Sequence, residues 1–261
     1  MKKVASADGT SIAFEKVGDG APVILVGGAF CDHRSRPAGL PLADALAAKF
    51  SVYSYDRRGR GESTDTPPYS VAREVEDLGA LLAAVGGSAH VYGHSSGAVL
   101  AFEAAHAGLP IQKLALYEPP LVLEGRAPVP KDLVQQLRAL SAAGKRAETA
   151  ELFLTRAVGV PAEVVARRKT TPAWPFLEAL AHTLSYDATL TADAPALLAR
   201  AASVTTPTLL LDGERSEPWL RSGVDKFARA LPNATHSTLA AQTHDVDPLA
   251  LGPVLLAFFG A

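Results

Sequence analysis

Short apolar runs alternate with helical patterns along the first 117 residues of the chain. The strand-like runs cover residues 11–17, 22–26, 51–55, 90–93 and 113–117, and most are unbroken apolar stretches. The helix-like segments cover residues 41–49, 71–85 and 97–107. From residue 22 to 117 the order is therefore β, α, β, α, β, α, β. This alternation predicts a parallel sheet whose strands are covered by helices on both faces.

The alternation of strands and helices ends after Tyr117. Four prolines lie between residues 119 and 130, and Ala/Leu-rich helical patterns then run from residue 131 to about residue 200. We expect residues 119–204 to form a helical lid inserted between two parts of one core, 1–118 and 205–261.

Strand and helix patterns alternate again after the expected lid. A strand is predicted at 207–212, a helix at 218–231, a strand at 234–239 and a closing helix at 248–259. The whole pattern is that of an α/β protein with one central, mostly parallel sheet.

Composition excludes several classes of protein. With 261 residues and 48% apolar content, the chain is long enough for one large core. Its 25 basic and 27 acidic residues are spread along the chain, so nucleic acid is not an expected partner. No run approaches the ~18 apolar residues of a membrane span, and the first residues lack a secretion signal. We expect a cytoplasmic protein without membrane partners; its oligomeric state is open.

A strand at 90–93 runs into Gly93-His94-Ser95-Ser96-Gly97 and then into a helical pattern. Glycines on both sides of Ser95 allow a sharp strand-to-helix turn that pushes the serine hydroxyl out of the fold. The alternative is an ordinary Gly/Ser turn. Because strand and helix are both present, the motif predicts a nucleophilic serine.

A serine nucleophile needs a base, a group that orients the base, and N–H donors for the developing oxyanion. His244 is the candidate base, because it lies between the last predicted strand and the closing helix. The other six histidines are expected to be structural. Two carboxylates, Glu118 and Asp212, stand at strand ends where either could orient His244, and Glu214 is a third candidate.

The chain resembles the α/β-hydrolase fold family over nearly its whole length. The resemblance rests on Gly93 to Gly97, on the loop Asp56-Arg-Arg-Gly-Arg-Gly-Glu-Ser63, and on the late His244. It implies the α/β-hydrolase fold, a mostly parallel central sheet flanked by helices with a helical lid after Tyr117. The loop lacks the lysine and glycine spacing of a phosphate-binding motif, and the resemblance implies a structural role for it.

The resemblance also indicates which carboxylate orients His244, the acidic residue of the catalytic triad. Most family members carry it in a pattern like G-x-x-D beyond the penultimate strand, whereas this chain reads Gly213-Glu214-Arg215-Ser216. A subset that includes zearalenone-type lactonases carries it at the end of the strand after the elbow helix, where this chain has Glu118. We therefore favour Glu118 over Asp212 and Glu214.

Two backbone N–H groups are expected to form the oxyanion hole. One belongs to Ser96, the residue after the nucleophile, and by resemblance the other belongs to Ala29, with Gly28 as the alternative. Phe30, in the same loop, is a candidate substrate contact. The lid residue Trp174 is another, and the alternative for it is a position in the core of the lid, where tryptophans of helical lids more often lie. Cys31 is expected to be a buried or pocket-wall thiol.

These residues predict a serine hydrolase that cleaves a carboxylic ester or lactone through an acyl-enzyme on Ser95. Neither a cofactor nor a metal is implied by the sequence. Dehalogenases and epoxide hydrolases do not fit, since they need a carboxylate at the elbow. Carbon–carbon bond hydrolysis and perhydrolysis use the same serine constellation and stay open. A noncatalytic ligand-binding relative also stays open, because Ser216 stands where most members have an aspartate.

Overall fold

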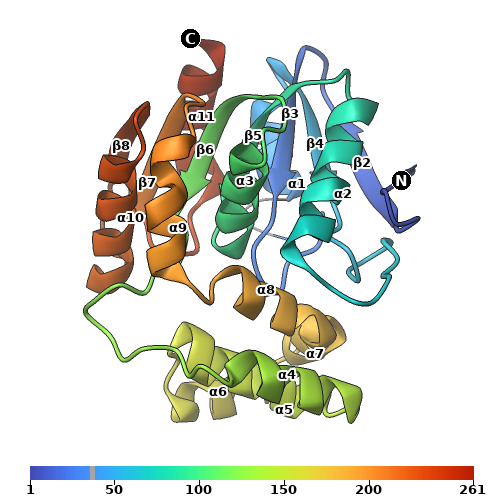
Figure 1. Cartoon of the computed structure of the whole chain (residues 1–261), viewed down its shortest axis with the longest axis vertical. Helices are drawn as coiled ribbons and strands as arrows, with labels where there is room; N and C mark the ends of the chain where they lie inside the picture. Colours follow the sequence, from blue (N-terminus) through green and yellow to red (C-terminus); the bar gives the residue numbers. More distant parts are fainter. Residues whose placement is uncertain (36–38) are drawn as a thin grey trace.

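A single eight-stranded sheet forms the centre of the protein (Figure 1), seen in a computed structural model that describes residues 1–35 and 39–261. Its strand order is β1-β2-β4-β3-β5-β6-β7-β8. From β4 to β8 neighbouring strands run parallel, while β1 and β2 join antiparallel at one edge. The strands are β1 Lys2–Ala5, β2 Ser11–Val17, β3 Ala21–Val26, β4 Phe50–Tyr55, β5 Ala89–His94, β6 Ile111–Tyr117, β7 Thr208–Gly213 and β8 Ala234–Leu239.

Helices cover both faces of this sheet. On one face lie α2 (Val71–Ala84), α3 (Ser96–His106) and α10 (Pro218–Ala230), and on the other lie α1 (Leu40–Leu46) and α11 (Pro248–Gly260). Both faces of each central strand are therefore buried, which explains the unbroken apolar runs.

Alternate side chains of the central strands belong to two different cores. In β3, Ile24 packs in the core under α2 and α3, whereas Leu25 packs in the core under α1 and α11. In β5, Val91 likewise packs in the first of these cores and Tyr92 in the second. Successive residues of a strand point to opposite faces, so each apolar run supplies both cores at once.

Six α-helices occupy the segment between β6 and β7, residues 119–204, which we call the helical insertion. They are α4 Leu133–Ala142, α5 Arg146–Leu152, α6 Ala162–Arg168, α7 Trp174–Leu180, α8 Leu184–Leu190 and α9 Ala194–Arg200. A π-helical turn, Phe153–Val158, continues α5. In Figure 1, α4 to α7 form a layer beyond the end of the sheet and α8 lies between that layer and α3.

The helical insertion has its own core, but parts of it, among them Leu121 and Leu190, pack in the core of the sheet. Residues of α4, α5, α7 and α8 pack together around Leu137, Phe153 and Trp174. Helix α9, however, places Ala194 and Leu197 in the core of the sheet, against α10. The last helix of the insertion is thus part of the sheet's covering layer.

The fold expected from the sequence is confirmed: the sheet is mostly parallel and flanked by helices. Strand β1 was not predicted, because its short KKVA segment is largely exposed and lacks an apolar run. Over residues 1–35 and 39–261, no helix combines the length and apolar character that crossing a membrane requires.

Candidate active site

Ser95 stands on a strained turn between β5 and α3. Its backbone has φ 57° and ψ −125°, a conformation that residues other than glycine rarely adopt. A Cβ at Gly93 would lie 2.6 Å from the Cα of Ala98, and one at Gly97 would collide with the carbonyls of Val26 and Gly27. Only glycine fits at both positions, so the G-x-S-x-G pattern follows from close backbone approach.

His244 and Glu118 lie next to each other at this end of the sheet. The Nδ1 of His244 is 2.7 Å from Oε2 of Glu118, whose other oxygen accepts a 2.7 Å hydrogen bond from the N–H of Gly213. Glu118 is fully buried. A carboxylate oxygen accepts, so Nδ1 carries the proton in this contact and Nε2 is the basic nitrogen. The loop before His244 is held by the Tyr117 hydroxyl, which donates to the Thr243 carbonyl at 2.6 Å.

The other two carboxylates considered from the sequence lie elsewhere. Asp212 is buried, and its Oδ2 is 3.3 Å from Nε2 of His236 and 3.5 Å from Nε of Arg221. Glu214 is exposed and accepts a hydrogen bond from the N–H of Ala241. The structure therefore brings Glu118, and neither Asp212 nor Glu214, to His244.

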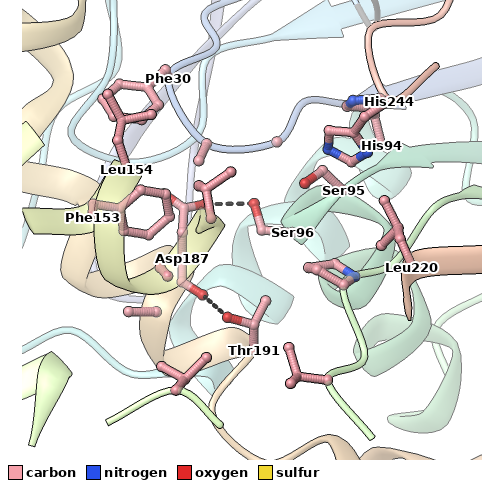
Figure 2. A pocket seen from close by; sticks show the side chains of 18 of the residues that line it. Phe30, His94, Ser95, Ser96, Phe153, Leu154, Asp187, Thr191, Leu220 and His244 are labelled. Atoms are coloured by element: carbon pink, nitrogen blue, oxygen red, sulfur yellow. Dashed lines mark hydrogen bonds between the residues drawn. The ribbon is translucent and has the colours of Figure 1, made fainter. Parts of the chain in front are cut away.

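Ser95 and His244 line the same cavity, which has a volume of about 350 Å³. Figure 2 shows both residues with His94 on one wall and Phe30, Phe153 and Leu154 on the opposite wall. The cavity wall is mostly apolar. Its polar members besides Ser95 and the two histidines include Ser96, Asp187, Thr191, Glu217 and Asp245.

His94 contacts His244 from the buried side. Their ring centroids are 4.9 Å apart, and His94 stacks on Tyr117. Burial, and then the neighbouring charge of His244, hold the pKa of His94 well below its usual value of 6.5. His94 is therefore neutral at neutral pH and does not repel a proton on His244.

The loop after β3 approaches the serine closely. A Cβ at Gly28 would lie 2.9 Å from Cβ of Ser95, so this position also requires glycine. Ala29 and Ser96 line the cavity. Within residues 1–35 and 39–261, neither backbone amide donates a hydrogen bond to the protein. Both amides are thus available to an oxygen placed in the cavity.

The two aromatic candidates have different positions. Phe30 lines the cavity and meets the Phe153 ring edge to face at 5.6 Å. Trp174 lies instead in the core of the helical insertion, where its Nε1 donates to Glu178 at 2.6 Å. The described residues of the cavity wall include Trp219, which the sequence did not single out.

Cys31 also lines the cavity, and burial raises the pKa of its thiol to about 11. At neutral pH it is a protonated thiol and a poor nucleophile. As for metals, no group of three His, Cys, Asp or Glu side chains in the described part of the chain is arranged to hold an ion.

Sequence reasoning also missed a buried group at the cavity, the carboxylate of Asp187 on α8. It contacts Arg57 and Arg60 at 2.7 Å each and accepts a 2.7 Å hydrogen bond from the Ser96 hydroxyl, which Figure 2 shows. Three arginines in one loop were a usable signal, because buried arginines require acidic partners. The partner itself lies far along the chain and could not be named.

Comparison with known proteins agrees with this geometry. The family model described as "Alpha/beta hydrolase family" matches residues 23–250. The chain belongs to the alpha/beta hydrolase family. Membership of this family supports the view that the protein is a hydrolase.

Relatives of this alpha/beta hydrolase include a solved alpha/beta hydrolase from Sphaerobacter thermophilus, 49% identical, with a TM-score of 0.92 and coverage of 99% and 100% of the two chains. A hydrolase structure from Pseudomonas aeruginosa is 27% identical, with a TM-score of 0.76 and coverage of 100% and 98%. N-formylmaleamate deformylase of Pseudomonas putida is 40% identical over 96 residues, 35% of this chain and 36% of that protein. That alignment thus spans about a third of the relative.

Proposed function

We propose that this alpha/beta hydrolase cleaves a carboxylic ester or lactone through an acyl-enzyme on Ser95. The observation that carries the proposal is the 2.7 Å contact between His244 and the buried Glu118, at the cavity that also holds the strained Ser95. A serine, an oriented imidazole and a carboxylate are the parts that acyl transfer requires.

In the proposed mechanism, Nε2 of His244 takes the proton of the Ser95 hydroxyl as its oxygen attacks the carbonyl carbon. Glu118 keeps the proton on Nδ1 and stabilises the imidazolium. The amides of Ser96 and Ala29 bind the oxyanion. His244 then protonates the leaving alcohol, and afterwards it removes a proton from the water that releases the acid and regenerates Ser95.

The cavity favours a substrate with an apolar body. Its volume of about 350 Å³ lies at the small end of ligand pockets, and aliphatic and aromatic side chains form most of its wall. Short- to medium-chain esters and small lactones are therefore the substrates to test first.

We also propose that the helical insertion acts as a lid. Val129, Leu133, Phe153 and Leu154 all come from it, and all four line the cavity. Phe153 and Leu154 lie across the cavity from Ser95 in Figure 2, which supports a lid that covers the serine.

The test of the proposed function is hydrolysis of p-nitrophenyl butyrate by the wild type and by Ser95→Ala, with fluorophosphonate labelling of both. Loss of the nucleophile should lower kcat about 1000-fold or more and abolish labelling. Ser237→Ala, the same substitution at an exposed serine of β8 outside the cavity, serves as a matched control for handling and folding. Full activity in Ser95→Ala would exclude the acyl-enzyme.

The noncatalytic alternative was motivated by Ser216, which stands where most family members have an aspartate. Glu118 already occupies the position beside His244, so this motive no longer applies. Among the described residues that line the cavity, none favours carbon–carbon bond hydrolysis or perhydrolysis over ester hydrolysis.

A further inference from the structure

Two consecutive carbonyls in the loop after β3 face buried arginines. Nη1 of Arg60 donates to the Gly28 carbonyl at 2.6 Å, and Nη1 of Arg57 is 3.4 Å from the Gly27 carbonyl. In a trans peptide the C=O and the following N–H point in opposite directions. By holding the Gly28 carbonyl, Arg60 therefore sets the direction of the Ala29 N–H. The cation also polarises that peptide and makes its N–H a stronger donor.

Ser96, whose N–H is the other proposed oxyanion donor, is linked to the same arginine through Asp187. The hydroxyl of Ser96 donates to Oδ1 of Asp187 at 2.7 Å, while Oδ2 of Asp187 lies 2.7 Å from Nη2 of Arg60. One carboxylate thus contacts the side chain of Ser96 directly and reaches the Ala29 amide through Arg60 and the Gly28 carbonyl.

This network is buried and balanced in charge. Arg57, Arg60, Asp187 and Glu74 are at most 2% exposed, and Glu74 completes the pairing by two hydrogen bonds from Arg57. Burial alone would raise the pKa of Asp187, but the charges of Arg60 and Arg57 outweigh it and hold the pKa below 3.8. Asp187 is therefore ionised at neutral pH. Desolvation offsets much of the attraction in a buried ion network, so stability alone is a weak explanation for its presence.

We propose that Asp187 is a positioning residue that sets the geometry of the oxyanion hole from the helical insertion. It aligns the N–H groups of Ser96 and Ala29, the first through the Ser96 hydroxyl and the second through Arg60. This inference rests on the proposed function, because it assigns a task to the donors of that mechanism. It also couples α8, and hence the insertion, to the catalytic end of the sheet.

The same loop provides a matched control. Arg58 and Asp77 form a second buried pair, with two contacts of 2.7 Å. The remaining hydrogen bonds of Arg58 go to Asp8 and to the Arg73 carbonyl rather than to the Gly27–Gly28 segment. Asp77→Asn thus removes a comparable buried charge without touching the oxyanion loop.

The experiment compares wild type, Asp187→Asn, Ser96→Ala and Asp77→Asn. For each, kcat and KM for p-nitrophenyl butyrate, the inhibition constant of an alkyl trifluoromethyl ketone and Tm are measured. The ketone adds to a serine and places an oxyanion in the hole, so its affinity reports donor geometry. We expect Asp187→Asn to lower kcat and ketone affinity about 10- to 100-fold with KM nearly unchanged. Ser96→Ala, which keeps its backbone N–H, should lose about 3- to 10-fold in both.

Asp77→Asn should lower Tm while kcat and ketone affinity stay within about twofold of wild type. The inference is overturned if Asp187→Asn keeps its kcat and ketone affinity, or if both aspartate variants lose them equally. If Asp187→Asn does not fold, Ser96→Ala decides: unchanged ketone affinity overturns the inference and weakened affinity supports it. If the wild type hydrolyses no ester and Ser95 is not labelled, the proposed function itself has failed, and the inference fails with it.

Discussion

Backbone strain is concentrated around the candidate active site. In the described part of the chain, the residues other than glycine with positive φ are Phe30, Ser95, Glu118 and Ala241. The first three line the cavity or contact His244, and Ala241 stands in the loop that leads to His244. Such conformations cost about 1–3 kcal/mol each and persist where the surrounding structure enforces them. Their location supports a site that holds side chains in set directions.

At the residue scale, the role of the carboxylate is directly testable. Glu118→Gln leaves the size of the side chain unchanged but removes the charge that keeps the proton on Nδ1 of His244. We expect kcat for p-nitrophenyl butyrate to fall about 1000-fold or more, because without this charge His244 carries its proton on Nε2 and cannot take the proton of Ser95. Asp212→Asn is the matched control, because Asp212 is equally buried at a strand end but lies beside His236. A large loss in Asp212→Asn with an unaffected Glu118→Gln would refute the assignment.

At the element scale, the ends of parallel strands assemble the site. Ser95 follows β5, Glu118 follows β6, Gly28 follows β3 and His244 follows β8, and all four strands point the same way. Loops at the carboxyl ends of such strands meet at one edge of the sheet. Residues separated by as many as 216 positions thereby come within reach of one another.

The turn after β3 offers a test at this scale. In Gly28→Ala the new Cβ would lie 2.9 Å from Cβ of Ser95, on the strained turn, and 3.0 Å from the carbonyl of His94, the last residue of β5. We expect kcat to fall at least about tenfold, because the serine or the oxyanion loop has to move. Gly79→Ala in α2 is the contrasting variant, since its Cβ would make only ordinary contacts of 3.6–3.8 Å with Leu109.

Gly79→Ala should raise the free energy of unfolding by about 0.5–1 kcal/mol at unchanged activity, because alanine is favoured over glycine inside a helix. Urea unfolding and esterase assays on both variants check the pair. Unimpaired catalysis in Gly28→Ala would show that the loop approaches Ser95 less closely than described.

At the scale of the whole molecule, buried charge joins the helical insertion to the sheet. Asp187 lies on α8 of the insertion, whereas Arg57 and Arg60 lie in the loop after β4. The insertion is thus attached by ionic contacts in addition to the apolar packing of α8 and α9.

This attachment predicts a pH dependence of stability. Since the pKa of Asp187 is lower in the folded protein than its ordinary 3.8, its contribution to stability is present above that value. The contribution is lost as the pH falls from 3.8 through the folded-state pKa. Urea unfolding of wild type and Asp187→Asn should therefore show a difference at pH 7 that shrinks below about pH 3.8. A difference that is constant over this range would contradict the prediction.

The sequence by itself determined the parallel sheet, the elbow at Ser95 and the choice of His244. These features are local: apolar runs report strands buried on both faces, and paired glycines report a turn without room for Cβ atoms. For the carboxylate beside His244, the family resemblance already favoured Glu118, and the tertiary structure shows the contact itself. Only the tertiary structure decided that Trp174 packs inside the insertion and that Asp187 joins Arg57 and Arg60. Each of these depends on contacts between residues distant in the chain, and no periodicity or spacing encodes such contacts.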